Sequence, residues 1–558
     1  MKIEKNFFQI SISFFLFLIS INEIKNFRCG ADDLKIKPKK LKFNNTYSKK
    51  ISNEVKDTGY TPIKIGMDYT NFTKPSSMDD ETFNKIKNII SDSLEDFKKF
   101  LQIQHVDIDL DGQEDEIKKD CEIQEISSDY RNFLINNDVI VFPSFSDELG
   151  FDVLASATAC LMYGFDSKII RPIGGNLYIS SDLSFDKENT DIFLKNVLLH
   201  EITHILVFDP DLFKELGMLT ERNSIYYVNS TNVILKARQH FNCETITGIP
   251  LEDHGGDGSA GGHWEARYML GDYMISEDYI DTVISDISLA LFEDTGYYKV
   301  NYYSGGLFKF GKNKGCEFLN QKCIINGQPI SEEFCVIKEQ PKCSQSRTVK
   351  GECGIYNFTL IGPIPSNNQY FSDPYKGGMD IADYCPVASQ IDIFETIYYS
   401  KSCSIGNSTL SPDYGEVISD NSFCFISSLL PSSSSLTQDT TQSICYRVEC
   451  NSSNKQIIVH VGSSTITCPT EGGTLSNISG FKGSIICPKY IDICTFENNV
   501  VCNELFNCLT KKVKANNDSN DFGENNENFT MINNKTYSSY KKLKFNLVLL
   551  LYYLLYLL

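Results

Sequence analysis

Two histidines and a glutamate at a fixed spacing are the residues of this chain best suited to chemistry. They form the sequence His200-Glu201-Ile202-Thr203-His204. Side chains four positions apart on an α-helix lie on one face, about one turn apart, so His200 and His204 can both ligate one Zn²⁺ ion. Glu201 follows the first ligand and can reach a water molecule on the metal, where it would act as a general base. The spacing therefore predicts a catalytic zinc site.

A catalytic zinc ion takes three protein ligands and keeps a fourth position open, so one more ligand must come from elsewhere. Among the seven histidines of the chain, the candidates are His263 and its rival His254. His263 follows a glycine-rich stretch that can bring the backbone close to a metal, and it precedes the single tryptophan. Met274 comes next; a methionine in a tight turn under three histidines would form a soft, apolar floor.

The surrounding pattern predicts the elements that position these residues. The zinc helix is expected to begin near Asn189 or Thr190, which are good N-caps, and to stop before Pro210. Alternation and helical spacing upstream predict a strand over residues 63–67, a helix over 77–101, and strands over 137–142 and 174–180. This order predicts an α+β catalytic unit with a mixed sheet beneath the zinc helix.

Composition limits the classes of function. A chain of 558 residues can form several domains, and its net charge of −20 argues against nucleic-acid binding, which needs a basic surface. Nineteen cysteines, fifteen of them between Cys316 and Cys508, indicate an oxidising compartment. Their odd number predicts at least one thiol that is unpaired or has another task.

Both ends of the chain carry signals for the cell surface. Residues 1–21, with Lys2 and Lys5 before an apolar run, are expected to be a secretory signal peptide. Residues 511–546 are expected to form a disordered polar spacer, followed by an apolar tail at 547–558 that is too short to span a bilayer as a helix. This tail predicts a lipid (GPI-type) anchor, with a short membrane-embedded tail as the alternative. Asn-x-Ser/Thr sequons at Asn71, Asn229, Asn357, Asn407, Asn451 and Asn477 agree with secretion.

The remaining chain divides by composition. We expect a short pro-segment at 22–60, a catalytic domain at 61–300 whose lower part begins at 210, and a disulfide-stapled, mostly β or irregular region at 301–510. Cys29 lies in the pro-segment. Its thiolate could bind the zinc and hold a precursor inactive, or it could be a disulfide partner or an exposed loop thiol.

Taken together, these motifs resemble the leishmanolysin-like surface metalloproteases, a branch of the metzincins. In that family a long insertion separates the helical histidine pair from a His-Trp-Glu motif, and here the insertion ends at His263-Trp264-Glu265. Further matches are Arg171-Pro-Ile-Gly-Gly175, residues 237–243, Leu251-Glu-Asp253, Met274, and an apolar stripe at Ile280, Val283, Ile284, Ile287 and Leu291 expected to form the following helix. The resemblance is specific over residues 60–300.

The resemblance implies a metzincin-type catalytic domain that holds one zinc ion per chain. It implies His200, His204 and His263 as zinc ligands, Glu201 as the base and Met274 in the turn below the metal. It also gives Cys29 a precedent, because precursors of this family carry an early cysteine that blocks the zinc.

One position departs from the family pattern. The family usually has glycine three residues after the second histidine, and this chain has Val207. A β-branched residue cannot adopt a positive φ cheaply. Either the helix continues to Phe208 and turns at Asp209-Pro210, or the site is distorted.

The expected function is that of an endopeptidase that cleaves extracellular or surface proteins, with a possible role in cell adhesion. The alternatives are a catalytically inert surface adhesin of the same fold, which Val207 favours, and a structural coat protein. The sequence does not determine the substrate or the oligomeric state. The expected partners are protein or peptide substrates and, through the tail, a membrane, but no nucleic acid.

Overall fold

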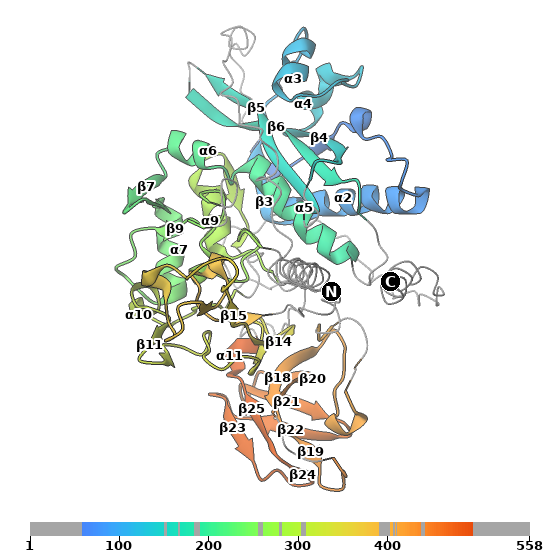
Figure 1. Ribbon diagram of the computed structural model, residues 1–558. Helices are drawn as coiled ribbons and strands as arrows, with labels where there is room; N and C mark the ends of the chain where they lie inside the picture. The colour runs from blue at the N-terminus through green and yellow to red at the C-terminus, as the bar shows by residue number, and fades with distance from the viewer. Residues whose placement is uncertain are drawn as a thin grey trace, which may run out of the picture. The chain divides into compact units, whose positions relative to one another are not determined.

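The computed structural model describes residues 59–149, 153–165, 168–183, 190–254, 260–277, 282–302, 308–389, 402–404, 408, 410–436 and 441–494. The architecture is mixed α+β (Figure 1). The expected signal peptide, Cys29, the polar spacer and the apolar tail lie outside the described residues.

A four-stranded sheet is the framework of the part that precedes residue 210. Its strand order is β2-β4-β6-β5; β2, β4 and β6 are parallel, and β5 is antiparallel to β6. The bounds are β2 (Ile65–Met67), β4 (Val139–Ser146), β5 (Ala155–Phe165) and β6 (Lys168–Ser180). This is the mixed sheet that the sequence predicts. The predicted strand at 63–67 is shorter than expected, and β5 was not predicted.

Helices cover both faces of this sheet. The side chains of β4 point alternately to the two faces and contribute to a separate apolar cluster on each. Val139 and Val141 belong to the cluster that includes the zinc helix, whereas Ile140 and Phe142 belong to a smaller cluster on the other face. The first face carries α2 (Asp80–Phe100) and α5 (Thr190–Leu206), which pack beside each other (Figure 1). The second carries α3 (Glu114–Asp120) and α4 (Phe133–Asn136).

Gly175 allows α5 to lie close to the sheet. A Cβ atom at this position would lie 2.6 Å from Cγ2 of Ile205 and 2.6 Å from the carbonyl oxygen of Thr158. In the same segment, the buried Arg171 guanidinium donates to the carbonyl oxygen of Asp138 at 2.7 Å. The Arg-Pro-Ile-Gly-Gly motif thus has a structural role, since its Gly175 allows α5 to lie close to β6.

The part that spans residues 210–300 folds back onto the start of the described chain. Its last strand, β10 (Tyr298–Val300), pairs with β3 (Leu101–Gln104), which also pairs with β1 (Tyr60–Pro62). Its other elements are α6 (Pro210–Glu215), β7 (Leu219–Arg222), β8 (Ile225–Val228), α7 (Thr231–Phe241), β9 (Ile249–Pro250), α8 (Ala266–Met269) and α9 (Asp286–Asp294).

Helix α9 is shorter than the apolar stripe predicts. Ser285 caps it by accepting from the backbone N–H of Ser288, so Val283 and Ile284 precede the helix although both are buried. The N-cap at Ser285 sets the start of the helix, although the apolar spacing extends upstream of it.

The cysteine-rich region contains short strands and one larger sheet. Its six-stranded antiparallel sheet has the order β22-β21-β20-β18-β25-β23 and its own apolar core. The elements of the region are α10 (Cys316–Asn320), β11 (Ile324–Ile325), β12 (Gln328–Pro329), β13 (Pro341–Cys343), β14 (Lys350–Cys353), β15 (Tyr356–Asn357), β16 (Lys376–Gly377), β17 (Ala388–Ser389), β18 (Ser422–Ser427), β19 (Leu430–Pro431), β20 (Gln442–Asn451), β21 (Gln456–Val461), β22 (Ser464–Cys468), β23 (Gly473–Ser476), β24 (Phe481–Lys482), β25 (Ser484–Cys487) and α11 (Tyr490–Ile493).

Eight disulfides form among the described cysteines. They are Cys121–Cys160, Cys243–Cys316, Cys323–Cys385, Cys335–Cys353, Cys343–Cys424, Cys403–Cys445, Cys450–Cys494 and Cys468–Cys487. The apolar core around α5 continues past residue 300 as far as Val387, whereas the second core begins at Phe423. The boundary expected at residue 300 therefore does not coincide with an edge of this core.

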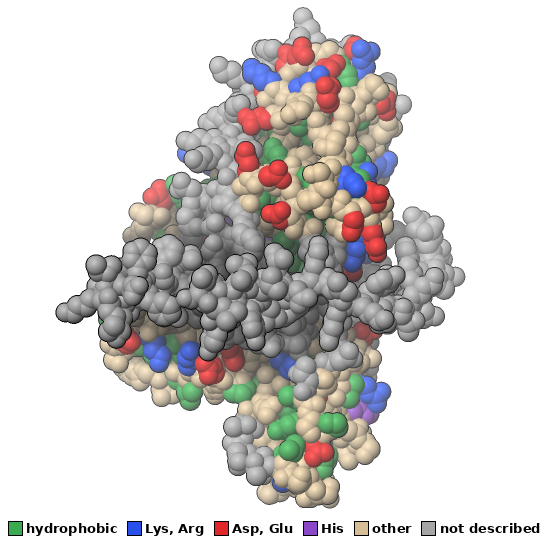
Figure 2. Space-filling model, turned by 45° about the vertical axis from the view of Figure 1, so that its right-hand side comes forward, with side chains coloured by type: hydrophobic (Ala, Val, Ile, Leu, Met, Phe, Trp, Pro, Cys, Tyr) green, Lys and Arg blue, Asp and Glu red, His purple; other side chains and the backbone are tan. Residues whose placement is uncertain are grey.

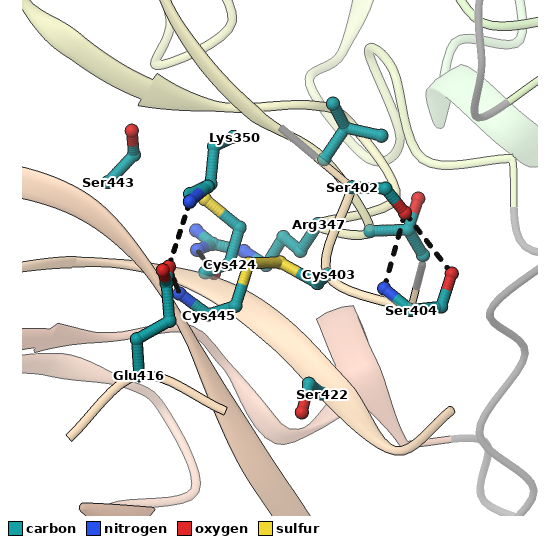
Figure 3. The surroundings of a disulfide bond; sticks show 12 residues. Arg347, Lys350, Ser402, Cys403, Ser404, Glu416, Ser422, Cys424, Ser443 and Cys445 are labelled. Carbon is teal, nitrogen blue, oxygen red and sulfur yellow. Dashed lines mark hydrogen bonds and ion pairs between the residues drawn. A yellow bond between two sulfur atoms is a disulfide. The ribbon is translucent and has the colours of Figure 1, made fainter. Parts of the chain in front are cut away.

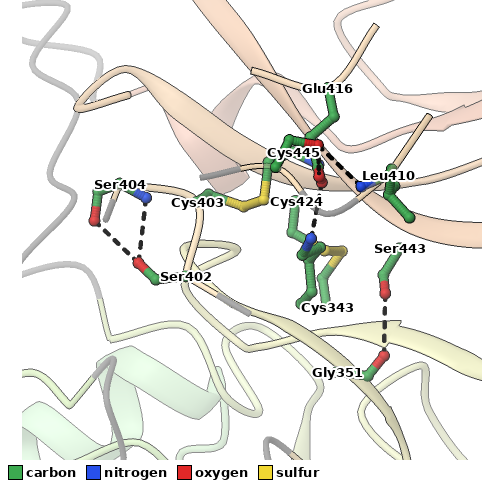
Figure 4. Close-up of polar contacts among 12 residues, drawn as sticks. Cys343, Gly351, Ser402, Cys403, Ser404, Leu410, Glu416, Cys424, Ser443 and Cys445 are labelled. Carbon is green, nitrogen blue, oxygen red and sulfur yellow. Dashed lines mark hydrogen bonds and ion pairs between the residues drawn. A yellow bond between two sulfur atoms is a disulfide. The ribbon is translucent and has the colours of Figure 1, made fainter. Parts of the chain in front are cut away.

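A buried ion pair links β14 to Glu416, which precedes β18 in the chain, near two of these disulfides. Lys350 Nζ lies 2.9 Å from Oε1 of Glu416, whose side chain is 1% exposed, and that oxygen also accepts from the backbone N–H of Cys445 (Figure 3). Figure 4 shows Cys343–Cys424 near Glu416, and Ser443 donating to the carbonyl oxygen of Gly351.

Removing one partner of this pair should be strongly destabilising. Glu416→Ala would leave the Lys350 ammonium buried without its carboxylate, and we expect it to lower the free energy of unfolding by about 3–5 kcal/mol. Chemical unfolding of the oxidised protein measures this loss. Glu449→Ala on the exposed side of β20 is the matched control. An equal effect of both variants would show that burial of Glu416 does not matter.

Charged side chains of both signs occur over the face drawn in Figure 2, red and blue being interspersed over its upper part. Among the described residues, none of the helices is both long enough and apolar enough to cross a membrane.

Candidate metal centre

Helix α5 buries the three residues of the histidine-glutamate motif. His200, Glu201 and His204 are 3%, 1% and 8% exposed, respectively. The apolar residues on either side of them, such as Leu198, Ile202 and Ile205, belong to the main core. The helix is therefore enclosed by packing, which fixes the direction of its polar side chains.

His263 joins the helical pair from a segment more than fifty residues further along the chain. The Nε2 atoms of His200 and His204 are 3.0 Å apart, and those of His200 and His263 are 3.2 Å apart. One ring nitrogen from each of the three buried imidazoles lies within 4.8 Å of the others. The structure thus brings together the three histidines that the sequence selects as ligands.

Two backbone carbonyls orient the helical imidazoles. Nδ1 of His200 lies 2.6 Å from the carbonyl oxygen of Tyr273, and Nδ1 of His204 lies 2.8 Å from that of Phe208. A carbonyl oxygen only accepts, so both Nδ1 atoms carry the hydrogen. Burial lowers the pKa of His200 to about 3 and that of His204 to about 4, so both rings are neutral at physiological pH.

The donor set fits a metal cation. In a neutral imidazole that is protonated on Nδ1, Nε2 carries a lone pair. The Nε2 atoms of His200 and His204 lie 3.0 Å apart, so their lone pairs face each other. Two facing lone pairs repel, and a cation bound between them would make this arrangement favourable. Three imidazole nitrogens are a ligand set typical of zinc, and hydrogen bonds from the outer ring nitrogens to carbonyls are typical of its outer shell.

Met274 lies in the turn that receives His200. Its side chain is fully buried, and its carbonyl oxygen accepts from the backbone N–H of Trp264, next to His263. Asp272 holds this turn: one carboxylate oxygen accepts from the N–H of Met274 at 2.8 Å, and the other accepts from the Ser288 hydroxyl at 2.8 Å. The Trp264 indole donates to the same hydroxyl. Sequence reasoning did not identify Asp272.

Asp272→Asn tests this support. The amide would present a donor where the carboxylate accepts from backbone and hydroxyl donors, so we expect a loss of about 1–3 kcal/mol in the free energy of unfolding. Thermal and urea unfolding measure the loss, with Asp286→Asn at the exposed start of α9 as the control. If Asp272→Asn unfolds at the wild-type midpoint, the carboxylate does not hold the turn.

His254, the rival ligand, lies in a different cluster. Its Nδ1 is 2.7 Å from Oδ1 of Asp253 and about 4 Å from the carboxylates of Glu252 and Asp383. The hydrogen bond to Asp253 raises the pKa of His254 above its usual value. His254 is thus engaged by carboxylates and does not belong to the three-histidine group.

Val207 fits its turn without backbone strain. Helix α5 ends at Leu206, two residues earlier than the extended-helix alternative expects, and Val207 does not adopt a positive φ. The N–H groups of Val207 and Phe208 both bond to the carbonyl of Thr203, and Asp209 then caps α6 with Pro210 in its first turn. The turn aims the Phe208 carbonyl at His204, so neither of the two expected alternatives describes it.

Comparison with known proteins agrees with this geometry. The sequence profile of the leishmanolysin family, peptidase M8, matches residues 78–500. The chain belongs to the leishmanolysin family. This family is one of metalloproteases, and the predicted resemblance and fold class are thereby confirmed.

Curated relatives come from several organisms. A leishmanolysin homolog of Crithidia fasciculata is 29% identical over 361 residues, covering 61% of this chain and 53% of the relative. Leishmanolysin of Leishmania donovani is 27% identical, covering 65% and 61%, and a leishmanolysin-like peptidase of Drosophila melanogaster is 27% identical, covering 47% and 43%. The chain therefore spans between two-fifths and about three-fifths of the length of these relatives.

Proposed function

We propose that this member of the leishmanolysin family is an active zinc-dependent endopeptidase. His200, His204 and His263 hold the zinc ion, Glu201 is the general base, and Met274 lies in the turn below. The observation that carries the proposal is the convergence of three buried imidazole nitrogens, two of which belong to rings oriented by backbone carbonyls.

Each protein group has a separate task in this proposal. Zinc, when bound, supplies a Lewis acid that polarises a carbonyl oxygen and acidifies water. Glu201, buried beside His200 on α5, accepts a proton from the attacking water and returns it to the leaving amine of the cleaved peptide. The carbonyls of Tyr273 and Phe208 keep the Nε2 atoms of His200 and His204 directed to one point.

Metal removal tests the proposal as a whole. We expect about one zinc ion per purified chain, loss of cleavage of an unstructured protein such as casein on dialysis against a chelator, and recovery on adding zinc. Elemental analysis and gel-based cleavage measure both. Cleavage that survives in metal-free protein would overturn the assignment.

The disulfides support a secreted or cell-surface location, because such bonds persist in oxidising compartments. Anchoring by the apolar tail, glycosylation and inhibition by Cys29 remain proposals made from the sequence. The inert-adhesin alternative depended on Val207, and the unstrained turn at that residue gives it no support.

A further inference from the structure

A second site lies in a cavity of about 390 Å³ that His200, His204 and His263 do not line. Its walls come from three stretches, residues 309–314, 340–347 and 489–492, together with Glu332 and Glu333. The disulfide Cys343–Cys424 ties one wall to the six-stranded sheet (Figure 4). This volume lies within the range of pockets that hold small organic molecules.

The lining is basic although the chain is acidic. Six lysine or arginine side chains and three carboxylates line the cavity, in a protein of net charge −20. Two of the carboxylates are already engaged, because Lys314 forms ion pairs with both Glu332 and Glu333. The third, Asp492, accepts from the backbone N–H of Lys489.

Several of the cations lack a carboxylate partner. Within the described part of the chain, Lys309, Lys312, Lys342 and Arg347 form no ion pair within 4.0 Å. Lys309 donates to the carbonyl oxygen of Ile491 at 2.6 Å, and Arg347 donates to that of Cys424 at 3.2 Å. Lys350 differs from these cations because it has the Glu416 carboxylate nearby; Figure 3 shows this pair together with Arg347.

A buried amide adds a further donor. The backbone N–H of Lys309 donates to Oε1 of Gln345 at 2.7 Å, which fixes Nε2 as the donor end of that side chain. Nε2 is buried and has no hydrogen-bond acceptor among the described residues. Buried donors without acceptors are costly, so this amide has capacity for an acceptor from a ligand.

Burial already disfavours the charged forms of three of these cations, Lys309, Lys342 and Arg347. Burial and the neighbouring Lys312 lower the pKa of Lys309 to about 7. Burial lowers the pKa of Lys342, a shift that the Glu333 carboxylate opposes and Arg347 increases, and burial also lowers the pKa of Arg347. A bound anion would oppose this effect by adding negative charge beside cations that outnumber the lining carboxylates six to three.

We propose that this cavity binds a small organic oxyanion, a phosphate or sulfate ester, through Lys309, Lys312, Lys342, Arg347 and Gln345. The anion supplies negative charge to cations that have no carboxylate partner among the described residues and that donate only to backbone carbonyl oxygens there, as Lys309, Lys342 and Arg347 do. The cavity volume exceeds that of a bare ion, so the remainder of the ligand is an uncharged group such as a sugar. The site is separate from the histidine centre and does not depend on the proposed peptidase activity.

Calorimetric titration of the full-length, oxidised protein tests this site. The probes are glucose 6-phosphate and glucose 6-sulfate, which distinguish the two esters, with glucose as the uncharged probe. We expect at least one ester to bind and glucose not to bind. Lys309→Met and the exposed Lys312→Met should each weaken ester binding about tenfold, whereas Lys98→Met on α2 should leave it unchanged.

The pH dependence provides a second measurement. Lys309, with its pKa near 7 in the empty site, is charged below that pH and neutral above it. Affinity for the sulfate ester, whose own charge does not change, should therefore fall as the pH rises from 6 to 8.5, with a proton taken up on binding at the higher pH. Failure of both esters to bind at millimolar concentration, or equal binding by wild type, Lys309→Met and Lys312→Met, would overturn the proposal.

Discussion

Glu201→Ala is expected to abolish peptide cleavage while the protein keeps its zinc. The carbonyl oxygens of Tyr273 and Phe208 orient the imidazoles of His200 and His204, so we expect metal content to stay at the wild-type level. A positioned general base contributes about 10²–10⁴-fold to the rate, so we expect the cleavage rate of the variant to be lower than that of the wild type by at least about 10²-fold. Cleavage of a fluorogenic peptide and zinc analysis on the same sample measure the two effects.

The control for this experiment lies on the same helix. Asp191→Ala removes a carboxylate from the first turn of α5, far along the helix from the histidines, and should leave both rate and zinc content unchanged. Loss of zinc from Glu201→Ala would mean that the carboxylate supports the metal site. A wild-type rate with full zinc content would exclude Glu201 as the base.

The histidine centre could be predicted because a short sequence spacing identifies two of its ligands and a family motif identifies the third. The i, i+4 spacing of His200 and His204 places both on one helix face whatever the rest of the fold does. The choice of His263 over His254 needed the family resemblance, since both follow or flank the same glycine-rich stretch. The two histidines have different neighbours in the structure. Nδ1 of His254 lies beside the carboxylate of Asp253, whereas Nε2 of His263 lies beside Nε2 of His200.

The supporting groups could not be predicted in the same way. The Tyr273 and Phe208 carbonyls are backbone atoms, which leave no trace in side-chain pattern. Asp272 is one acidic residue among many until the fold brings it to Ser288. Strand β5 was missed because its residues, from Ala155 to Phe165, are mostly small or apolar and its pairing with β6 contains bulges, which break the alternation that marks a strand.

His263→Ala should remove zinc-dependent stability as well as activity. Zinc that binds only the folded state adds RT ln(1 + [Zn]/Kd), about 2.7 kcal/mol at one hundred times Kd. Loss of one of the three zinc ligands should lower the affinity for zinc by more than the roughly 10–100-fold that is typical when a hydrogen-bond partner of a ligand is removed. We therefore expect the zinc-induced rise in melting temperature, clear in the wild type, to be absent in His263→Ala at the same zinc concentration.

His254→Ala decides between the two candidate ligands. Its imidazole is partly exposed and pairs with Asp253, so its loss should cost at most about 1 kcal/mol of stability and leave the zinc response intact. The reverse result, with zinc response lost in His254→Ala and kept in His263→Ala, would move the metal to the Glu252–Asp253–His254 group, the other described set of residues able to hold a cation. Both variants remove one imidazole, so a difference between their zinc responses must come from the position of the histidine.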